Sequence, residues 1–461
     1  MNLNRFAWLV VATLGVLGLA LHSGASAAEP GPSAQASFTT VHVAPKVETD
    51  PMPHSGDASD DPAIWINPTD PSKSTIIGTD KTPGAEGTGG GLGVYDISGH
   101  QIQYVSDGGI NNVDIRYNFP LAGQPTDLVV GSNKRYSSLT AYRVNPRTRL
   151  LESVTAHDPN GIYTGLSAYG ICMYHSPFTG KYYVFETQSP HVGDDTGEVQ
   201  QWELFDNGSG KVDGKKVRTF YVGSDAEGCV ADDVTGALYL VPTRQGVYQY
   251  GAEPDAGDAR TQVASFSTGE LKHGLEGVSL YYTSKNTGYL IVSNQGVNTF
   301  VVYRRETNAQ GQHEYVTTFQ IVAGNGIDEV QDTDGIDVTN VNLGSLFPDG
   351  VFVAQDGVND VGNINFKLVP WKSIAGTALT IDTTWNPRSI GGDSGSVPMA
   401  TPTNTATATA TATSTATTAP TAPTELPSPT ATSTEEPSVS PTAAKEESAS
   451  NTVMWLPMLM R

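Results

Sequence analysis

Short apolar runs, each opened by a polar or acidic residue and followed by a turn, recur through the middle of the chain. The residues that lead these runs lie 51, 57, 58, 49 and 58 positions apart. A repeat of this length in a strand-rich chain is typical of a β-propeller, in which each repeat forms one blade. The lead residues are Asp61, Asn112, Tyr169, Glu227, Glu276 and Asp334. The pattern therefore predicts six blades whose first strands begin at one mouth of a central channel.

The rest of each repeat also has the character of strands. Second runs such as residues 74–78 and 288–292 are rich in β-branched and aromatic residues, and turn-forming residues precede them. Third runs such as residues 139–143 alternate apolar and polar positions, as strands with one wetter face do. No helical period is sustained between residues 40 and 390. We expect an all-β, six-bladed β-propeller of four-stranded blades over residues 38–390, with a strand in residues 38–47 that pairs into the last blade and closes the ring.

The two ends of the chain do not fit this pattern. Arg5 precedes an apolar run over residues 6–21, and small residues follow at 25–27, so residues 1–28 are expected to be a secretory signal peptide. Residues 393–452 are a linker of Thr, Pro, Ala and Ser that is predicted to be disordered, because it has too few apolar residues to form a core. Residues 453–461 form a short apolar C-terminal tail. The protein is expected to be secreted, and the tail is either a device for retention at the cell surface or a plain disordered end.

The charge balance narrows the choice of partners. The chain has 26 basic and 48 acidic residues and a formal net charge of −22. Nucleic acid is disfavoured as a partner, because no basic stripe is present to neutralise phosphates. Carboxylates recur at the blade openings, and oxygen-rich clusters of this kind suit Ca²⁺. A single Asp at such a position is more often a turn former, but a whole ring of them predicts a cation site. The protein is expected to be a monomer.

Cations are predicted at the same mouth. If the first strand of a blade runs away from the mouth, the second strand returns to it. Second runs end in Lys81, in the pair Lys134–Arg135 and in Arg244. Lys and Arg bind anions, whereas carboxylates bind metal ions. A mouth with both groups suits a polyanion held by metal ions and basic side chains together.

The chain contains two cysteines, Cys172 and Cys229. They lie in adjacent repeats, at offsets of three and two residues from the lead positions, and should point to opposite sides of their strands. We expect two buried thiols, with a disulfide as the alternative in an exported protein.

Several segments strongly resemble the β-propeller phytases over residues 48–371. They are residues 57–65, 111–117, the pair Asp232–Asp233, residues 332–337 and residues 353–357. The resemblance implies a six-bladed, calcium-dependent phosphatase of the 3-phytase type, which removes phosphate from myo-inositol hexakisphosphate (phytate) by direct attack of a water held by calcium ions. In agreement, the chain has no Arg-His-Gly motif of histidine acid phosphatases and no Arg six positions after either cysteine.

The resemblance also implies roles for individual residues. It implies several structural and catalytic Ca²⁺ ions, and phytate bound as its calcium complex. The implied metal-binding residues are Glu48, Asp60, Asp61, Tyr169, Glu227, Glu276, Asp328, Asp334 and Asp356. The implied catalytic residues are Asp60, Lys81, Tyr169 and Glu227, and the implied substrate-binding residues are Lys81, Lys134, Arg135 and Gln295.

The chain departs from the family pattern at three places. Thr243 and Gly274 stand where acidic residues are common, which predicts fewer calcium ions or weaker affinity. The loop over residues 187–196 lacks a lysine that the family has there, and His191 is a candidate replacement. Two alternatives therefore stay open: a calcium-dependent propeller lactonase, and a non-catalytic surface propeller.

Overall fold

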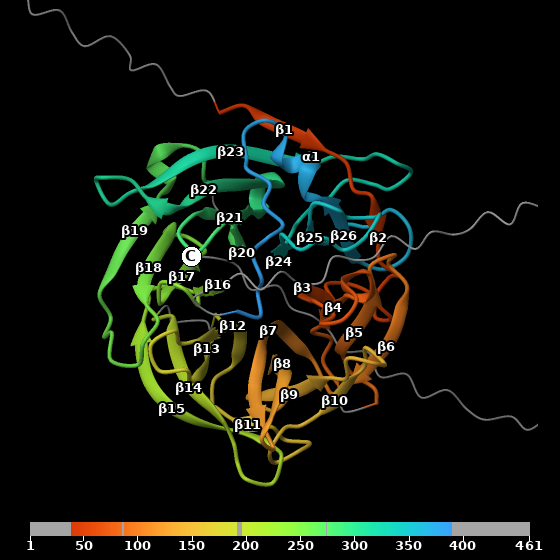
Figure 1. Cartoon of the computed structure of the whole chain (residues 1–461), viewed down its shortest axis with the longest axis vertical. Helices are drawn as coiled ribbons and strands as arrows, with labels where there is room; N and C mark the ends of the chain where they lie inside the picture. The colour runs from red at the N-terminus through yellow and green to blue at the C-terminus, as the bar shows by residue number, and fades with distance from the viewer. Residues whose placement is uncertain (1–37, 85–86, 191–195, 273, 390–461) are drawn as a thin grey trace, which may run out of the picture. The chain divides into compact units, whose positions relative to one another are not determined.

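The described part of the chain is built almost entirely from β-strands. The computed structural model describes residues 38–389 apart from 85–86, 191–195 and 273. The strands form six sheets arranged around a common axis, as Figure 1 shows. The prediction of an all-β, six-bladed propeller is confirmed.

The first three blades, named A to C in chain order, each contain antiparallel neighbours in sequence order. Blade A consists of β3 (Ser59–Trp65), β4 (Thr75–Asp80), β5 (Gly91–Asp96) and β6 (Gln101–Ser106). Blade B consists of β7 (Ile110–Leu121), β8 (Gln124–Asn133), β9 (Ser138–Val144) and β10 (Leu151–Ser153), with β11 (Ile162–Tyr163) also paired to β9. Blade C consists of β12 (Ala168–His175), β13 (Tyr182–Gln188), β14 (Glu198–Asp206) and β15 (Val212–Tyr221).

Blades D to F complete the ring. Blade D consists of β16 (Ala226–Asp232), β17 (Ala237–Pro242), β18 (Val247–Gly251) and β19 (Arg260–Ala264). Blade E consists of β20 (Leu275–Tyr282), β21 (Gly288–Asn294), β22 (Thr299–Thr307) and β23 (His313–Ile321). Blade F consists of β24 (Ile336–Thr339), β25 (Val351–Asp356) and β26 (Asn365–Pro370), followed by the short helix α1 (Trp371–Ala375). Three single 3₁₀ turns cover Pro71–Lys73, Phe266–Thr268 and Gln295–Val297.

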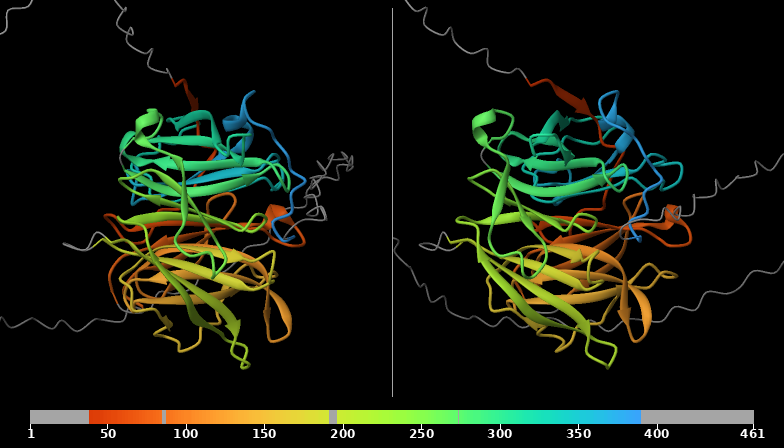
Figure 2. Two further views of the ribbon diagram at one scale, coloured as in Figure 1. Left: turned by 90° about the vertical axis from the view of Figure 1, so that its left-hand side faces the viewer. Right: turned by 60° about the vertical axis from the view of Figure 1, so that its left-hand side comes forward.

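The first strand of every blade lines the centre of the ring. Figure 1 shows β3, β7, β12, β16, β20 and β24 around the axis. Each of these strands contacts the first strand of the next blade, and β24 contacts β3, so the ring is closed. The sheets of successive blades lie against one another in Figure 2. Most backbone edges are therefore hidden, which is the usual benefit of radial closure.

The N-terminal strand does not close the ring in the predicted way. Thr40–Val43 (β1) pairs in parallel with β23 and adds a fifth strand to blade E, so the expectation that residues 38–47 pair into the last blade is wrong for this segment. Only Val47–Glu48 (β2) pairs with β26 and gives blade F its fourth strand. The N-terminal segment therefore pairs with two blades. It first meets the open edge of β23 in blade E, and only then reaches β26 in blade F.

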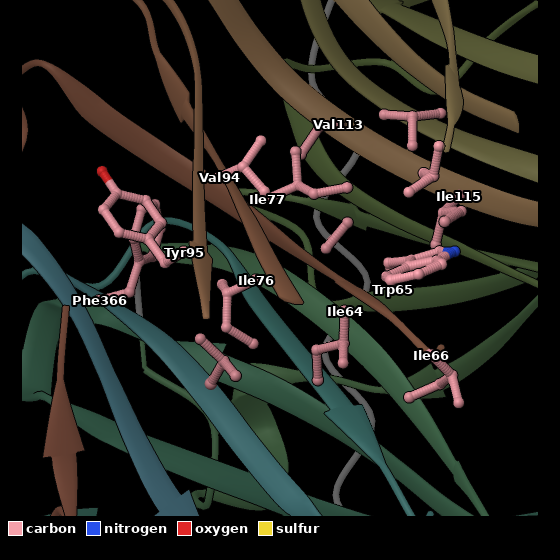
Figure 3. Packing of buried hydrophobic residues seen from close by; sticks show 14 of the residues in the cluster. Ile64, Trp65, Ile66, Ile76, Ile77, Val94, Tyr95, Val113, Ile115 and Phe366 are labelled. Atoms are coloured by element: carbon pink, nitrogen blue, oxygen red, sulfur yellow. The ribbon is translucent and has the colours of Figure 1, made fainter. Parts of the chain in front are cut away.

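The core lies between neighbouring blades. Figure 3 shows the packing of Trp65, Ile64 and Ile115 from the first strands of blades A and B. The ring of Phe366 in blade F packs directly on Gly78 in blade A, where a Cβ would lie 2.1 Å from a ring carbon. Only glycine therefore allows this approach between the two sheets.

The two cysteines form a disulfide, so the expectation of free buried thiols is wrong. Their Cα atoms are 5.6 Å apart, and both residues are buried. The predicted opposite orientations are the reason the bond forms. Neighbouring blades stack face to face, so opposite faces of β12 and β16 are turned toward each other across the blade C–D interface.

The described chain ends across the far end of the channel. Trp385 stacks on Tyr282, the last residue of β20, with ring centroids 4.8 Å apart. Arg388 forms an ion pair with Asp127, which lies near the beginning of β8. Both contacts lie opposite the end where the blades open, so the predicted functional mouth stays uncovered by this segment. In the described residues no helix has the length and apolar character needed to cross a membrane. The predicted signal peptide, linker and tail, and His191, lie outside the described residues.

Candidate active site at one mouth of the channel

The first strands of five blades begin with the same irregularity. In blades A to E the pairing between first and second strand shifts register directly after the opening pair, as in a β-bulge. Bulges re-aim side chains and are common beside active sites. Glycine follows the lead residue in blades C to F, and a Cβ on Gly170 would lie 1.8 Å from the carbonyl oxygen of Glu227. This close approach of neighbouring backbones draws the lead side chains together at the mouth.

Lys81 lies among carboxylates from two blades. Its Nζ is 2.9 Å from Asp57 Oδ1, 3.0 Å from Asp60 Oδ2 and 3.3 Å from Asp334 Oδ2. The Asp60 side chain is fully buried and that of Lys81 is 15 % exposed. Burial lowers the pKa of Lys81, but the surrounding carboxylates outweigh this and raise it above its ordinary value. Lys81 is therefore a fixed positive charge at the edge of the mouth.

Asn111 connects the carboxylates of blades A and D. Its amide nitrogen donates to Asp60 Oδ2 at 3.0 Å and to Glu227 Oε1. Its Oδ1 accepts a hydrogen bond of 2.8 Å from Lys134 Nζ. Asn111 therefore links the Lys134 ammonium to the carboxylate cluster through its own side chain. Asn111 belongs to the segment at residues 111–117 that resembles the phytases, but its bridging position was not predicted from the sequence.

The acidic residues of the cluster repel one another. Burial, followed by the charges of Asp60 and Glu276, raises the pKa of Glu227 well above its ordinary value. Burial and the charge of Asp334 raise the pKa of Glu276 to about 8. Burial and Asp60 raise the pKa of Asp334 to about 7. The raised pKa values mean that these carboxyl groups ionise together only when further positive charge enters the mouth.

The remaining predicted mouth residues take different positions. The pKa of Tyr169 is raised by burial and by Glu227, with which its side chain is hydrogen-bonded. Gln295 Nε2 donates to Asp334 Oδ1 at 2.6 Å, while Arg135 Nη1 donates to the carbonyl oxygen of Gly84 at 3.0 Å. Asp61 faces inward, and its Oδ2 accepts the backbone N–H of Val113 at 3.1 Å.

The donor set of the mouth fits a hard divalent cation. Asp60 Oδ1 and Glu276 Oε2 are buried oxygens without a hydrogen-bond partner. Unpartnered buried oxygens are costly, and a cation that prefers carboxylate and amide oxygens would satisfy them. Across the part of the chain that the structure describes, no three acidic, His or Cys side chains form a completed metal site. The Lys81 ammonium lies between Asp60 and Asp334, so ion binding here involves side-chain adjustment.

Three of the predicted metal ligands do not join the mouth cluster. Glu48, Asp328 and Asp356 instead surround the buried Lys367. Neither Lys367 nor the contact of Asp57 with Lys81 was predicted from the sequence. The available signal was a lysine in the middle of the apolar run at residues 364–369, where a solvated side chain is not expected.

Comparison with known proteins gives the class. The profile of the family described as Phytase matches residues 9–391. The 3-phytase of Bacillus subtilis (strain 168) is 42% identical over 342 residues, which cover 72% of this chain and 84% of that protein. The chain belongs to the Phytase family. A solved structure of Chaetomium thermophilum Sqt1, bound to the N-terminus of a ribosomal protein, has a TM-score of 0.35 and 12% identity over 68% of this chain and 72% of that one.

Proposed function

We propose that this phytase hydrolyses the phosphate monoesters of phytate at the mouth that holds Lys81, and that it does so with calcium. The observation that carries this proposal is the cluster of Asp60, Glu227, Glu276 and Asp334 around one fixed cation. A propeller with cations at the rim alone would favour the lactonase alternative. Here Lys81 lies within the carboxylate cluster, which supports phosphate chemistry.

The basic and amide groups at the mouth are placed to hold phosphate. Lys81 and Lys134 each present an ammonium group beside the cluster, within 3.3 Å of Asp334 and 2.8 Å of Asn111 respectively. Arg135 and Gln295 lie at the ends of the returning strands of blades B and E. One ammonium would hold the transferring phosphoryl group while the others hold neighbouring phosphates of the same substrate. These groups orient the ester at the carboxylates.

Calcium is proposed because carboxylates alone would repel phytate. The whole chain has a formal charge of −22, and the substrate is a polyanion. Asp60, Glu227, Glu276 and Asp334 would hold the ions, and Tyr169 and Asn111 lie beside them. Bound calcium supplies neutralisation of phosphate charge and a water of lowered pKa. The same ions make the calcium complex of phytate the expected substrate form.

The test is release of phosphate from phytate by the purified chain in calcium and after chelation. The expected result is loss of release in EDTA and recovery when calcium is returned. Lys81→Ala should lower release, whereas Lys73→Ala is the matched control, since Lys73 is an exposed lysine of the same blade that pairs only with Asp70. Equal activity of the two variants would contradict the placement of the site.

We further propose that the mature protein is a secreted monomer and that the C-terminal tail retains it at the cell surface. The proposal rests on the composition of residues 1–28, 393–452 and 453–461. Truncation after residue 390 should leave phytate hydrolysis intact and increase release into the medium, which fractionation of expressing cells measures. Equal release of the full-length and truncated chains would contradict the retention role.

A further inference from the structure

A lysine occupies the place where the resemblance to phytases implies metal ligands. The Lys367 side chain is fully buried, and its Nζ is 2.7 Å from Glu48 Oε2 and 3.3 Å from Asp356 Oδ2. It also contacts Asp328 Oδ1 directly and donates to Asn359 Oδ1 at 2.8 Å. A buried ammonium is stable only where oxygen atoms replace its lost water. These five residues are called the closure cluster below.

The closure cluster joins the segments that close the propeller. Glu48 on β2 lies directly opposite Lys367 on β26, and the two residues are 319 positions apart in the chain. Asp356 ends β25, the neighbouring strand. Asp328 lies between β23 and β24 and so brings in the connection from blade E. One ammonium therefore fastens the N-terminal strand, the last blade and the preceding connection.

The closure cluster does not fit a calcium ion. Its carboxylate oxygens are largely engaged: Asp328 Oδ2 accepts the backbone N–H of Asp360 at 2.8 Å, and Asp356 Oδ2, which lacks a hydrogen-bond partner, lies 3.3 Å from the ammonium. Asp356 Oδ1 accepts the backbone N–H of Gln331 at 3.0 Å. A calcium ion at the centre of these carboxylates would occupy the space of the ammonium and be repelled by it. The mouth differs, because the Lys81 side chain is 15 % exposed and can turn toward solvent to admit an ion, whereas the Lys367 side chain is fully buried.

We infer that the Lys367 ammonium is a built-in cation that takes the place of a metal ion at the ring closure. Seven of the nine metal ligands implied by the resemblance then separate into two sets. Asp60, Glu227, Glu276 and Asp334 respond to calcium, whereas Glu48, Asp328 and Asp356 are neutralised by the chain itself. Closure of the propeller is therefore independent of calcium, and only the mouth depends on it.

The test uses the full chain and two readouts other than activity: the number of bound calcium ions, from equilibrium dialysis, and the melting temperature in EDTA. Asp328→Asn should leave the calcium count at the wild-type value and lower Tm in EDTA by roughly 5–10 °C, because it removes a partner of a buried charge. Glu276→Gln is the matched mouth variant. It should lower the calcium count without lowering Tm in EDTA, because it relieves repulsion among buried carboxylates.

The opposite pattern would overturn the inference. In that case the Asp328→Asn variant would bind one calcium ion fewer and would melt in EDTA at the wild-type temperature. Lys367→Gln is a second test. If this variant were as stable in EDTA as the wild type, the ammonium would not stabilise the ring closure. The inference is separable from the proposed function. If the wild type binds no calcium, the calcium-dependent mechanism fails, while a lowered Tm of Asp328→Asn still supports the built-in cation.

Discussion

Glu186 provides a quantitative test of how buried charge affects this propeller. It lies on β13 in blade C and is fully buried. Burial raises the pKa of Glu186 from 4.5 to about 8, and the Thr164 hydroxyl offsets only part of this. The residue paired with it on β12 is Ile171, and among the residues that the structure describes no charged group contributes to the raised pKa. The folded protein therefore keeps Glu186 protonated at neutral pH.

The consequence for stability follows from proton linkage. Above a pH of about 4.5 the unfolded chain loses this proton, while the folded chain holds it up to about 8. The unfolded state then binds fewer protons, so the free energy of unfolding falls as the pH rises through this window. At pH 8 and above the cost amounts to about 5 kcal/mol. Below pH 4.5 both states are protonated and the cost vanishes.

Glu186→Gln removes the titration and keeps the size of the side chain. The variant should gain little stability at pH 5 and up to about 5 kcal/mol at pH 8.5. Urea unfolding at pH 5, 7 and 8.5 in constant EDTA measures the difference. Glu314→Gln on β23 is the control, because Glu314 is exposed and its nearest partner is Asn308. A gain from Glu186→Gln that does not change with pH would refute the reasoning.

Three further predictions follow from the site and the fold. Cys172→Ser combined with Cys229→Ser should lower the free energy of unfolding by about 4 kcal/mol, because the bond closes a loop with a separation of 57 residues; an unchanged urea midpoint would contradict this. Glu227→Ala and Lys81→Ala should each lower kcat by ~10²-fold, and added calcium should partly rescue only Glu227→Ala; equal rescue of both would show that their roles are not distinct. Calcium at a hundredfold excess over Kd should stabilise the fold by about 2.7 kcal/mol, so identical melting curves in EDTA and millimolar calcium would exclude ion binding to the folded state.

The repeat and its openings could be predicted from the sequence because each blade is a local unit. Asp61, Asn112, Tyr169, Glu227 and Glu276 all lie within the first strands of their blades, near the mouth, and Asp334 lies just before β24. Strand periodicity and turn residues act over a few positions, so they can be read without knowledge of the tertiary structure. The cluster of Lys81 with Asp60 and Asp334 follows from this regularity.

Contacts between distant segments could not be predicted in the same way. The closure cluster joins residues up to 319 positions apart, and nothing local to Glu48 or Asp328 indicates a lysine partner. The cysteines were misjudged because alternation along a strand defines which face a side chain occupies, but not which face the next blade covers. The N-terminal strand was placed one blade too far because pairing at an open edge depends on the finished ring.

The decisive measurement is phosphate release from phytate by residues 29–390 in calcium, in EDTA, and in calcium restored after EDTA. We expect release with calcium, none in EDTA, and recovery when calcium returns. Undiminished release in EDTA would contradict the calcium-dependent mechanism, and absence of release under all three conditions would contradict the assignment of phytate hydrolysis to this mouth.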